Sequence, residues 1–218
     1  MKLLQQKSYL RIIVVTAVVI AIELLITAPA FAHHPMGGRL PANFFEGIMS
    51  GLGHPVIGLD HLAFVIASGL IALKITGGII IPVSFVIATA IGAGIHLAAI
   101  DLPIPEIVIA ASVVLFGILL AAKGKTRNPD YSLKIALLAA IAGIFHGFAY
   151  GEGIFGAETT PIVAYLIGFT IIQLAISLAA YVMADRLTKS ISFKYIARFV
   201  GGAIAAIGIV FLSSAIIG

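Results

Sequence analysis

The sequence predicts an all-α membrane protein: a polytopic helix bundle with six spans after a signal peptide. Of its 218 residues, 61% are hydrophobic and 10% are charged, whereas a soluble domain carries roughly 25% charged residues. The mean hydropathy is +1.18, and apolar stretches near the ~20 residues that a membrane helix needs recur along the chain. Cysteine is absent, which excludes disulfides and thiolate metal sites. The net charge of +4 does not indicate a nucleic-acid partner, because in a membrane protein the sidedness of the charges matters more than their sum.

Residues 1–32 are interpreted as a secretory signal peptide. Basic residues precede a long apolar stretch, and an Ala-x-Ala pattern ends at Ala32, as in a cleavable signal. Glu23 is unusual inside the apolar stretch, so an uncleaved first span is the alternative. Cleavage after Ala32 would start the mature chain at His33 and His34. A free amine beside an imidazole is an accessory metal-binding candidate, with a disordered terminus as the alternative.

Residues 33–218 are predicted to form a single transmembrane domain. Its first stretch, 40–53, is apolar but broken by glycines, and it is too short to cross a ~30 Å hydrocarbon layer. We therefore expect a short re-entrant or interfacial helix on the outer side. Six spans follow, at about 55–73, 78–100, 105–122, 132–150, 160–184 and 196–217. The first three and the last three spans can form an inverted repeat, a plan found in transporters, although the two halves have little sequence similarity.

The connections between the predicted spans alternate in charge. Lysine and arginine gather in the first, third and fifth connections, and acidic residues in the second and fourth. By the positive-inside rule, the first, third and fifth connections are cytoplasmic. Both mature termini are then expected on the outer side of the cell membrane. All six histidines fall in the outer half on this topology, which suggests a funnel where acidic groups attract cations and imidazoles bind them.

The first motif reads HPVIGLDH over residues 54–61. Two imidazoles and a carboxylate suit a divalent metal such as Ni, Co, Cu or Zn, and ionisable groups in a span mark ion paths, binding sites or proton relays. On a straight helix His54 and His61 would be separated by ~10 Å. We therefore expect either a helix break around Gly58, which we favour, or two successive sites. Asp60 would ligate the ion or accept a hydrogen bond from a histidine. The alternative is a cluster that only caps a helix.

The second motif reads FHGFAYGEG over residues 145–153. His146 is a candidate metal ligand, and the glycines keep the helix surface beside it small. Tyr150 is interpreted as an aromatic residue of the membrane interface, with an oxygen donor as the alternative. Glu152 is either an accessory ligand or a solvated loop charge.

Three further polar residues lie within the predicted spans. His96 is a candidate ligand, with a packed, hydrogen-bonded residue as the alternative. Gln173 and Ser177, one turn apart, are expected to form interhelical hydrogen bonds. The predicted metal-binding set is His54, Asp60, His61, His96 and His146, with Glu152, His33 and His34 as accessory candidates.

At these residues the chain resembles the HupE/UreJ family of membrane proteins, which are regarded as nickel or cobalt permeases. The most specific parts are HPxxGxDH at residues 54–61 and HGxAxGxG at residues 146–153. The resemblance implies that the first motif is essential for transport, and it assigns His54, Asp60 and His61 a metal role. Many members are expected to carry a second histidine where this chain has Tyr150. That departure bears on how many ligands the fourth span supplies, and on which metal is preferred.

The leading functional expectation is a secondary permease that carries Ni²⁺ or Co²⁺ through the lipid bilayer. The chain shows no nucleotide-binding motif, and no permanently bound cofactor is expected. Nitrogen and oxygen ligands are consistent with Ni or Co, but the affinity order alone would favour Cu, so the metal follows from the resemblance. One alternative is an intramembrane zinc-dependent hydrolase with an open water position on its metal. Another is a copper-binding or metal-sensing membrane protein that relies on His33 and His34.

Overall fold

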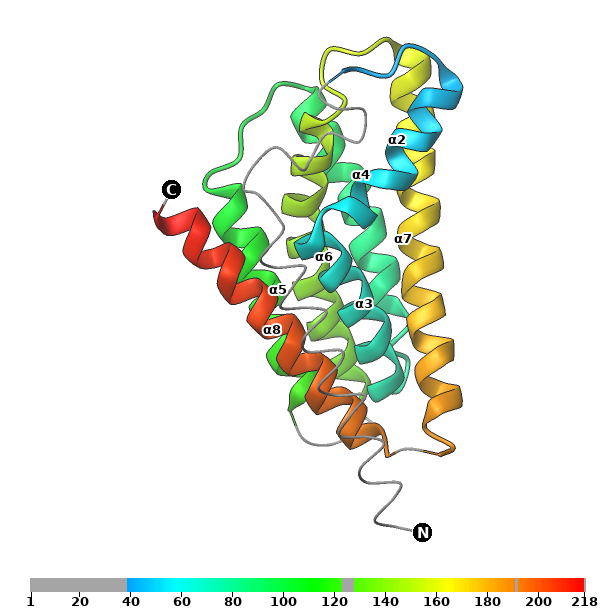
Figure 1. The fold of residues 1–218 in the computed structure, drawn as a ribbon, viewed down its shortest axis with the longest axis vertical. Coiled ribbons are helices and arrows are strands. Elements are labelled where there is room, and N and C mark those ends of the chain that lie inside the picture. The colour runs from blue at the N-terminus through cyan, green and yellow to red at the C-terminus, as the bar shows by residue number, and fades with distance from the viewer. Residues whose placement is uncertain (1–38, 123–127, 191, 218) are drawn as a thin grey trace. The chain divides into compact units, whose positions relative to one another are not determined.

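The computed structural model describes residues 39–122, 128–190 and 192–217. The regular elements in these ranges are seven α-helices (Figure 1), which confirms the predicted all-α class. The predicted signal peptide, His33 and His34 lie outside the described residues. The helices are α2 (Phe44–Ile57), α3 (Leu59–Lys74), α4 (Ile80–Leu97), α5 (Pro105–Ala121), α6 (Pro129–Glu152), α7 (Thr159–Leu187) and α8 (Phe193–Ile217).

Most of these helices are long and apolar enough to cross a membrane. Four of them, α4, α6, α7 and α8, meet this condition individually, and α2 and α3 meet it together as one bent pair. The remaining helix, α5, is apolar but has 17 residues, a length of about 26 Å at 1.5 Å per residue. Length and composition therefore give four to five span candidates within the described ranges, and the third of the six predicted spans corresponds to the shorter α5.

The helix break expected around Gly58 is confirmed, because α2 and α3 meet there at an angle of 80°. Gly58 has extended backbone angles, with φ −74° and ψ 104°. The predicted boundary between the outer helix and the first span, at 53–55, is wrong, since α2 continues through Pro55 to Ile57. Proline in a helix lacks only its own N–H donor and strains the preceding turn. The backbone leaves the helix three residues later, at Gly58.

Glycines allow α4 to pack directly against the backbone of α6. A Cβ atom added to Gly143 would lie 2.5 Å from the carbonyl oxygen of Phe85, and one added to Gly151 would lie 2.9 Å from that of Ala93. Such close approach is typical of membrane helices, where small residues line the interfaces. The residue numbers rise together along this contact, so α4 and α6 run parallel.

The bent pair packs on α7 in a similar way. A Cβ atom on Gly47 would lie 2.5 Å from the carbonyl oxygen of Pro161, and one on Gly69 would lie 3.0 Å from the Cα of Ser177. These contacts make α2 and α3 parallel to α7. The third extensive pairing joins α5 and α8, which run antiparallel.

These pairings have the pattern of an inverted repeat. One half comprises α2–α3, α4 and α5, and the other comprises α6, α7 and α8. Exchanging the halves maps the α4–α6 pair onto the pair of α7 with α2–α3, and it maps the α5–α8 pair onto itself. The parallel and antiparallel directions are preserved by this exchange. The helix contacts therefore fit the predicted repeat, although the sequences of the halves differ.

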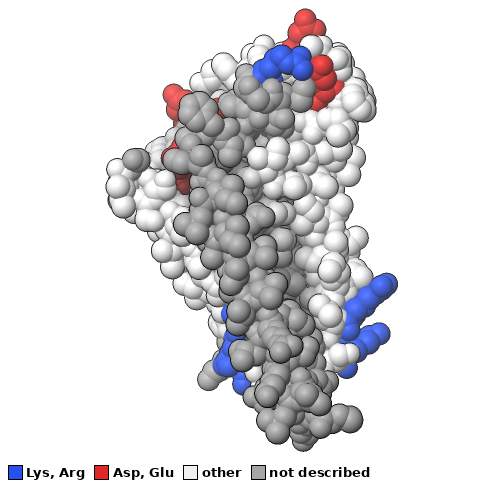
Figure 2. Space-filling view, viewed as in Figure 1, with Lys and Arg blue, Asp and Glu red and all other residues white. Residues whose placement is uncertain are grey.

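Charged side chains separate toward the two ends of the described helices. Figure 2 shows acidic side chains gathered at one end and most basic side chains at the other. The first we call the acidic end; its members are Glu46, Asp101, Glu106, Glu152 and Glu158. The second we call the basic end; its basic members are Lys74, Lys134, Arg186, Lys189, Lys194 and Arg198. Two acidic residues, Asp130 and Asp185, also lie at this end.

Candidate metal site

The bend at Gly58 brings the two histidines of the first motif together. The ring centroids of His54 and His61 lie 5.9 Å apart with the rings nearly perpendicular, and each side chain is 1% exposed. A Cβ atom on Gly58 would lie 2.6 Å from Cδ2 of His61. A glycine at the bend therefore leaves room for the His61 ring to fold back toward α2.

His61 also meets His146, which comes from α6. Their Nδ1 atoms lie 2.7 Å apart, and Nε2 of His146 lies 3.0 Å from the hydroxyl of Ser112 on α5. Ser112 donates its one proton to the carbonyl oxygen of Ile109 at 2.6 Å. The hydroxyl oxygen must therefore accept a hydrogen from Nε2 of His146.

The protons of both imidazoles follow from this chain of hydrogen bonds. A neutral His146 that donates from Nε2 has its lone pair on Nδ1, so Nδ1 of His61 is the donor in the contact between them. Neutral His61 then carries its own lone pair on Nε2. A lone pair on an imidazole nitrogen is what a transition metal binds.

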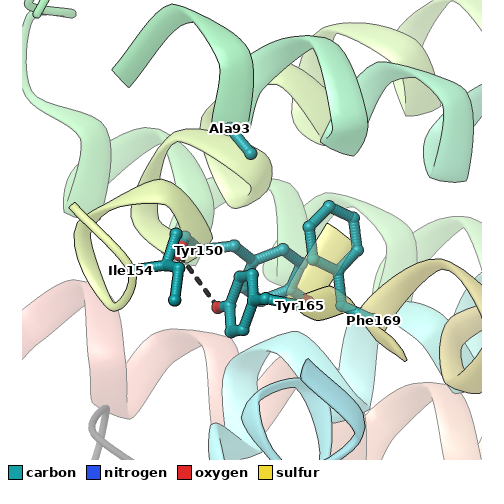
Figure 3. Close-up of a cluster of buried hydrophobic side chains, with 5 residues drawn as sticks. All are labelled: Ala93, Tyr150, Ile154, Tyr165 and Phe169. Carbon is teal, nitrogen blue, oxygen red and sulfur yellow. Dashed lines mark hydrogen bonds between the residues drawn. The ribbon is translucent and has the colours of Figure 1, made fainter. Parts of the chain in front are cut away.

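The same reasoning applies to His54 and Tyr165 on α7. The Tyr165 hydroxyl lies 2.5 Å from Nδ1 of His54 and donates its proton to the backbone carbonyl of Tyr150 at 2.9 Å (Figure 3). Nδ1 of His54 must therefore donate to the Tyr165 oxygen, and its Nε2 carries the lone pair. His54 and His61 thus have the same tautomer, set by different partners.

Asp60 lies beside this pair as a largely buried carboxylate. Its Oδ1 accepts a hydrogen bond from the backbone N–H of His61 at 2.8 Å. One carboxylate oxygen therefore satisfies a backbone donor in the first turn of α3, as the capping interpretation expects. The carboxylate also brings a negative charge close to the imidazoles.

Tyr150 is buried inside the site, so its interpretation as an interface aromatic is wrong. The side chain is 0% exposed, and its ring centroid lies 5.0 Å from that of His54 and 4.6 Å from that of His61. Figure 3 shows it packed with Tyr165 and Phe169. Its hydroxyl has no hydrogen-bond partner among the described residues. The expectation failed because it used only the position of Tyr150 near a span end, whereas α7 and the bent pair cover that end.

A layer of phenylalanines lies next to His146 on the side of the basic end. Phe64, Phe85 and Phe116 come from α3, α4 and α5 and are fully buried. The Phe64 ring lies 4.8 Å from that of His146, 4.5 Å from that of Phe85 and 4.3 Å from that of Phe116. On the side of α3, α4 and α5, an apolar layer therefore lies between His146 and the basic end.

Comparison with known proteins agrees with the family resemblance that the sequence suggested. The family described as HupE / UreJ protein matches residues 20–211. The chain belongs to the HupE/UreJ family. Protein HupE from Rhizobium leguminosarum bv. viciae is 31% identical over 186 residues, which cover 83% of this chain and 89% of the relative. No solved structure matches.

Two candidate ligands of this HupE/UreJ protein lie apart from the cluster formed by His54, Asp60, His61 and His146. The His96 ring contacts Phe148 and Phe155, with centroid distances of 4.5 and 5.4 Å. Glu152 is exposed at the end of α6. Within the described ranges, no three or more His, Asp or Glu side chains are arranged to hold a metal ion. The imidazoles of the cluster thus contact one another and their partners.

Sequence reasoning missed two residues that define the cluster. Tyr165 and Ser112 set the tautomers of His54 and His146, yet they are 111 and 34 residues away in the sequence. Ser112 was visible as a hydroxyl in the middle of a predicted span, where small residues such as serine often lie at helix interfaces and bond across them. Tyr165 gave no local signal, because an aromatic residue near a span end is ordinary in membrane helices.

Proposed function

We propose that this HupE/UreJ protein is a secondary transporter of divalent transition-metal ions, Ni²⁺ or Co²⁺, across the cytoplasmic membrane. Membership of a family associated with nickel and cobalt transport supports the class of substrate. The apolar helices support a multi-pass membrane protein. The ion binds at His54, Asp60 and His61 on the outer side of the membrane, which the positive-inside rule assigns to the acidic end.

The separation of His54 and His61 is the observation that carries this proposal. An imidazole nitrogen binds a transition metal at about 2 Å. Two rings that share one ion therefore have centroids roughly 5 to 6.5 Å apart, once the radius of each ring is added. The observed distance is 5.9 Å, and the hydrogen bonds leave the lone pair of each ring on Nε2. A straight helix would have kept the rings too far apart for one ion.

Neighbouring groups supply oxygen atoms and charge to the same ion. The Asp60 carboxylate offsets part of the positive charge, and the buried Tyr150 hydroxyl is a neutral oxygen next to both rings. Nitrogen and oxygen donors without thiolate suit Ni²⁺ and Co²⁺. His96 and the exposed Glu152 act earlier, as capture groups between the acidic end and the cluster.

The inverted repeat supplies a mechanism for release. His61 lies on α3 and His146 on α6, which are corresponding helices of the two halves. Rocking of one half against the other changes the contact between these two rings, as in alternating access around a site between repeats. The same motion moves Phe64 and Phe85, which come from the first half and contact His146 from the second. Phe116, also from the first half, packs on Phe64.

Uptake of radiolabelled Ni²⁺ into proteoliposomes tests the proposal. The parent chain is compared with His61→Ala and with Ser213→Ala. The Ser213 hydroxyl is exposed on α8 and, among the described residues, bonds only to its own helix. We expect uptake by the parent and by Ser213→Ala, and loss of uptake by His61→Ala. Equal uptake by the parent and His61→Ala would remove the proposed site.

Elemental analysis of the purified protein separates transport from zinc chemistry. A transporter releases its ion, so we expect little metal to remain after purification in a chelator-containing buffer. A stoichiometric Zn²⁺ that survives this treatment, without Ni²⁺ or Co²⁺ uptake, would favour a zinc-dependent hydrolase.

A further inference from the structure

One face of α7 extends from the histidine cluster toward the basic end. Tyr165, Phe169, Gln173 and Ser177 recur every four residues along it, and all four are buried. Each step advances about 6 Å along a helix. Tyr165 bonds to His54, and the ring of Phe169 lies 5.3 Å from that of Tyr150. Gln173 and Ser177 are polar and lie beyond the cluster.

Gln173 has a fixed orientation on this face. Its Nε2 donates to the backbone carbonyl of Phe169 at 3.0 Å and to the hydroxyl of Thr89 at 3.3 Å. A carbonyl oxygen only accepts, so the amide nitrogen must occupy this position and Oε1 must point the other way. The side chain is 0% exposed, and Oε1 has no hydrogen-bond partner among the described residues. A buried acceptor that makes no hydrogen bond destabilises the folded protein. The orientation of Gln173 therefore lowers the stability of the fold.

The contact between Gln173 and Thr89 joins the two halves of the chain. Thr89 is on α4 and Gln173 on α7, which correspond in the inverted repeat, just as His61 and His146 lie on corresponding helices. Thr89 gives its own proton to the carbonyl oxygen of Val86 at 2.8 Å. The Thr89 oxygen therefore accepts a hydrogen bond from Gln173. The amide oxygen of Gln173 remains without a hydrogen-bond partner among the described residues.

We propose that Oε1 of Gln173 is a second, oxygen-donor station for the divalent cation, between the histidine cluster and the basic end. This inference rests on the transport function proposed above. A neutral amide oxygen binds Ni²⁺ or Co²⁺ more weakly than imidazole nitrogen does. Passage through a membrane needs sites weak enough for the ion to leave. One turn further along, the hydroxyls of Ser68 and Ser177 lie 3.2 Å apart and continue the polar face.

Three variants distinguish ion binding by Gln173 from a purely structural role, in which Gln173 only links α7 to α4 through Thr89. Gln173→Met keeps the length of the side chain but removes the amide. We expect its transport rate to fall about tenfold, as for the loss of one polar contact with the ion. Equilibrium Ni²⁺ binding to the histidine cluster should stay within about twofold, because separate sites are nearly additive. Thr89→Val removes a partner of Nε2 and keeps Oε1, so its transport should resemble that of the parent.

Thr170→Val is the matched control, since within the described part of the chain the Thr170 hydroxyl bonds only to Leu166 on its own helix. Transport is measured in proteoliposomes, and binding by calorimetry on the same preparations, after thermal melting has shown that each variant is folded. If Gln173→Met transports at the parent rate, the proposal that Gln173 binds the ion is overturned. It is also overturned if Thr89→Val loses as much transport as Gln173→Met, because Gln173 would then act only by linking α7 to α4.

Gln173→Glu keeps the test decisive if Gln173→Met does not fold. The glutamate retains an oxygen at the same place and adds a charge, so we expect an additional bound Ni²⁺ per chain and slower release. A binding stoichiometry unchanged from the parent would contradict the station. A parent chain that neither binds nor transports Ni²⁺ or Co²⁺ overturns the transport function itself, whereas a functional parent with an inert Gln173 overturns only this inference.

Discussion

The Nδ1 atoms of His61 and His146 lie 2.7 Å apart, although the residues are 85 positions apart in the sequence. They come from α3 and α6, which occupy corresponding positions in the two halves of the chain. The contact is directional, because Ser112 fixes the proton of His146 and thereby that of His61. The position of the lone pair on His61, the proposed metal ligand, is thus set by the Ser112 hydroxyl on a third helix, α5.

Ser112→Ala tests this directional chain. Nε2–H of His146 then loses its acceptor inside an apolar environment, which costs about 1–3 kcal/mol for a buried donor. We expect a lower melting temperature and weaker Ni²⁺ binding, because His146 no longer holds His61 in one tautomer. Thermal melting and calorimetry on the purified protein measure both effects. Ser213→Ala on α8 is the control. If Ser112→Ala binds Ni²⁺ as tightly as Ser213→Ala does, the hydrogen bonds that link Ser112 to His61 through His146 are unimportant for binding.

Removing the hydroxyls of Tyr150 and Tyr165 should have opposite effects on stability. Tyr165 bonds to His54 and to the backbone of Tyr150, so Tyr165→Phe leaves two buried groups unsatisfied and destabilises by about 1–3 kcal/mol. The Tyr150 hydroxyl has no partner among the described residues. Tyr150→Phe should therefore stabilise the fold, by on the order of 1 kcal/mol, while it weakens Ni²⁺ binding.

Denaturation in detergent and Ni²⁺ calorimetry on these two variants provide the comparison. Each variant controls for the other, because both lose one oxygen and keep the ring. A Tyr150→Phe protein that is less stable than the parent would mean that the hydroxyl has a structural partner. Unchanged Ni²⁺ affinity would remove Tyr150 from the proposed oxygen donors.

Gly58→Ala should impair the site without altering any ligand. The added methyl group would lie 2.6 Å from Cδ2 of His61, so the ring must move and the distance to His54 must change. We expect Ni²⁺ uptake to fall at least about tenfold, because ligands displaced by an ångström no longer share one ion. Gly94→Ala on α4 is the control, since an added Cβ there meets nothing within 4 Å. Similar Ni²⁺ uptake by Gly58→Ala and Gly94→Ala would show that the close approach of the His61 ring to residue 58 is not required for transport.

The local pattern of the sequence was sufficient to predict the bend and the histidine pair. Gly58 and Pro55 weaken a regular helix in any tertiary context, and the high hydropathy of each stretch is what a membrane span requires. These properties belong to short stretches, so they can be recognised without knowledge of the helix contacts. The end of the outer helix was predicted too early, at 53–55, because Gly53 and Pro55 also weaken a helix, whereas α2 continues to Ile57.

The partners of the histidines could not be predicted in the same way. Tyr165 and Ser112 reach the cluster only because α7 packs on the bent pair and α5 lies against α6. Hydropathy is nearly uniform around such helices and does not show which face meets which neighbour. Tyr150 shows the result: its position at a span end suggested the interface, and the packing of α7 buries it. The metal role of the cluster stays a prediction.

The orientation of the helices can be tested with single cysteines, because the natural chain has none. Glu158→Cys and Lys189→Cys place a thiol at exposed positions at the acidic and basic ends. If the acidic end is outside, as the positive-inside rule predicts, a membrane-impermeant thiol reagent should label Glu158→Cys in intact spheroplasts. It should label Lys189→Cys only after the membrane is permeabilised. The reverse pattern would place the histidine cluster in the cytoplasmic half, and the ion would then meet Gln173 before His61 on its way inward.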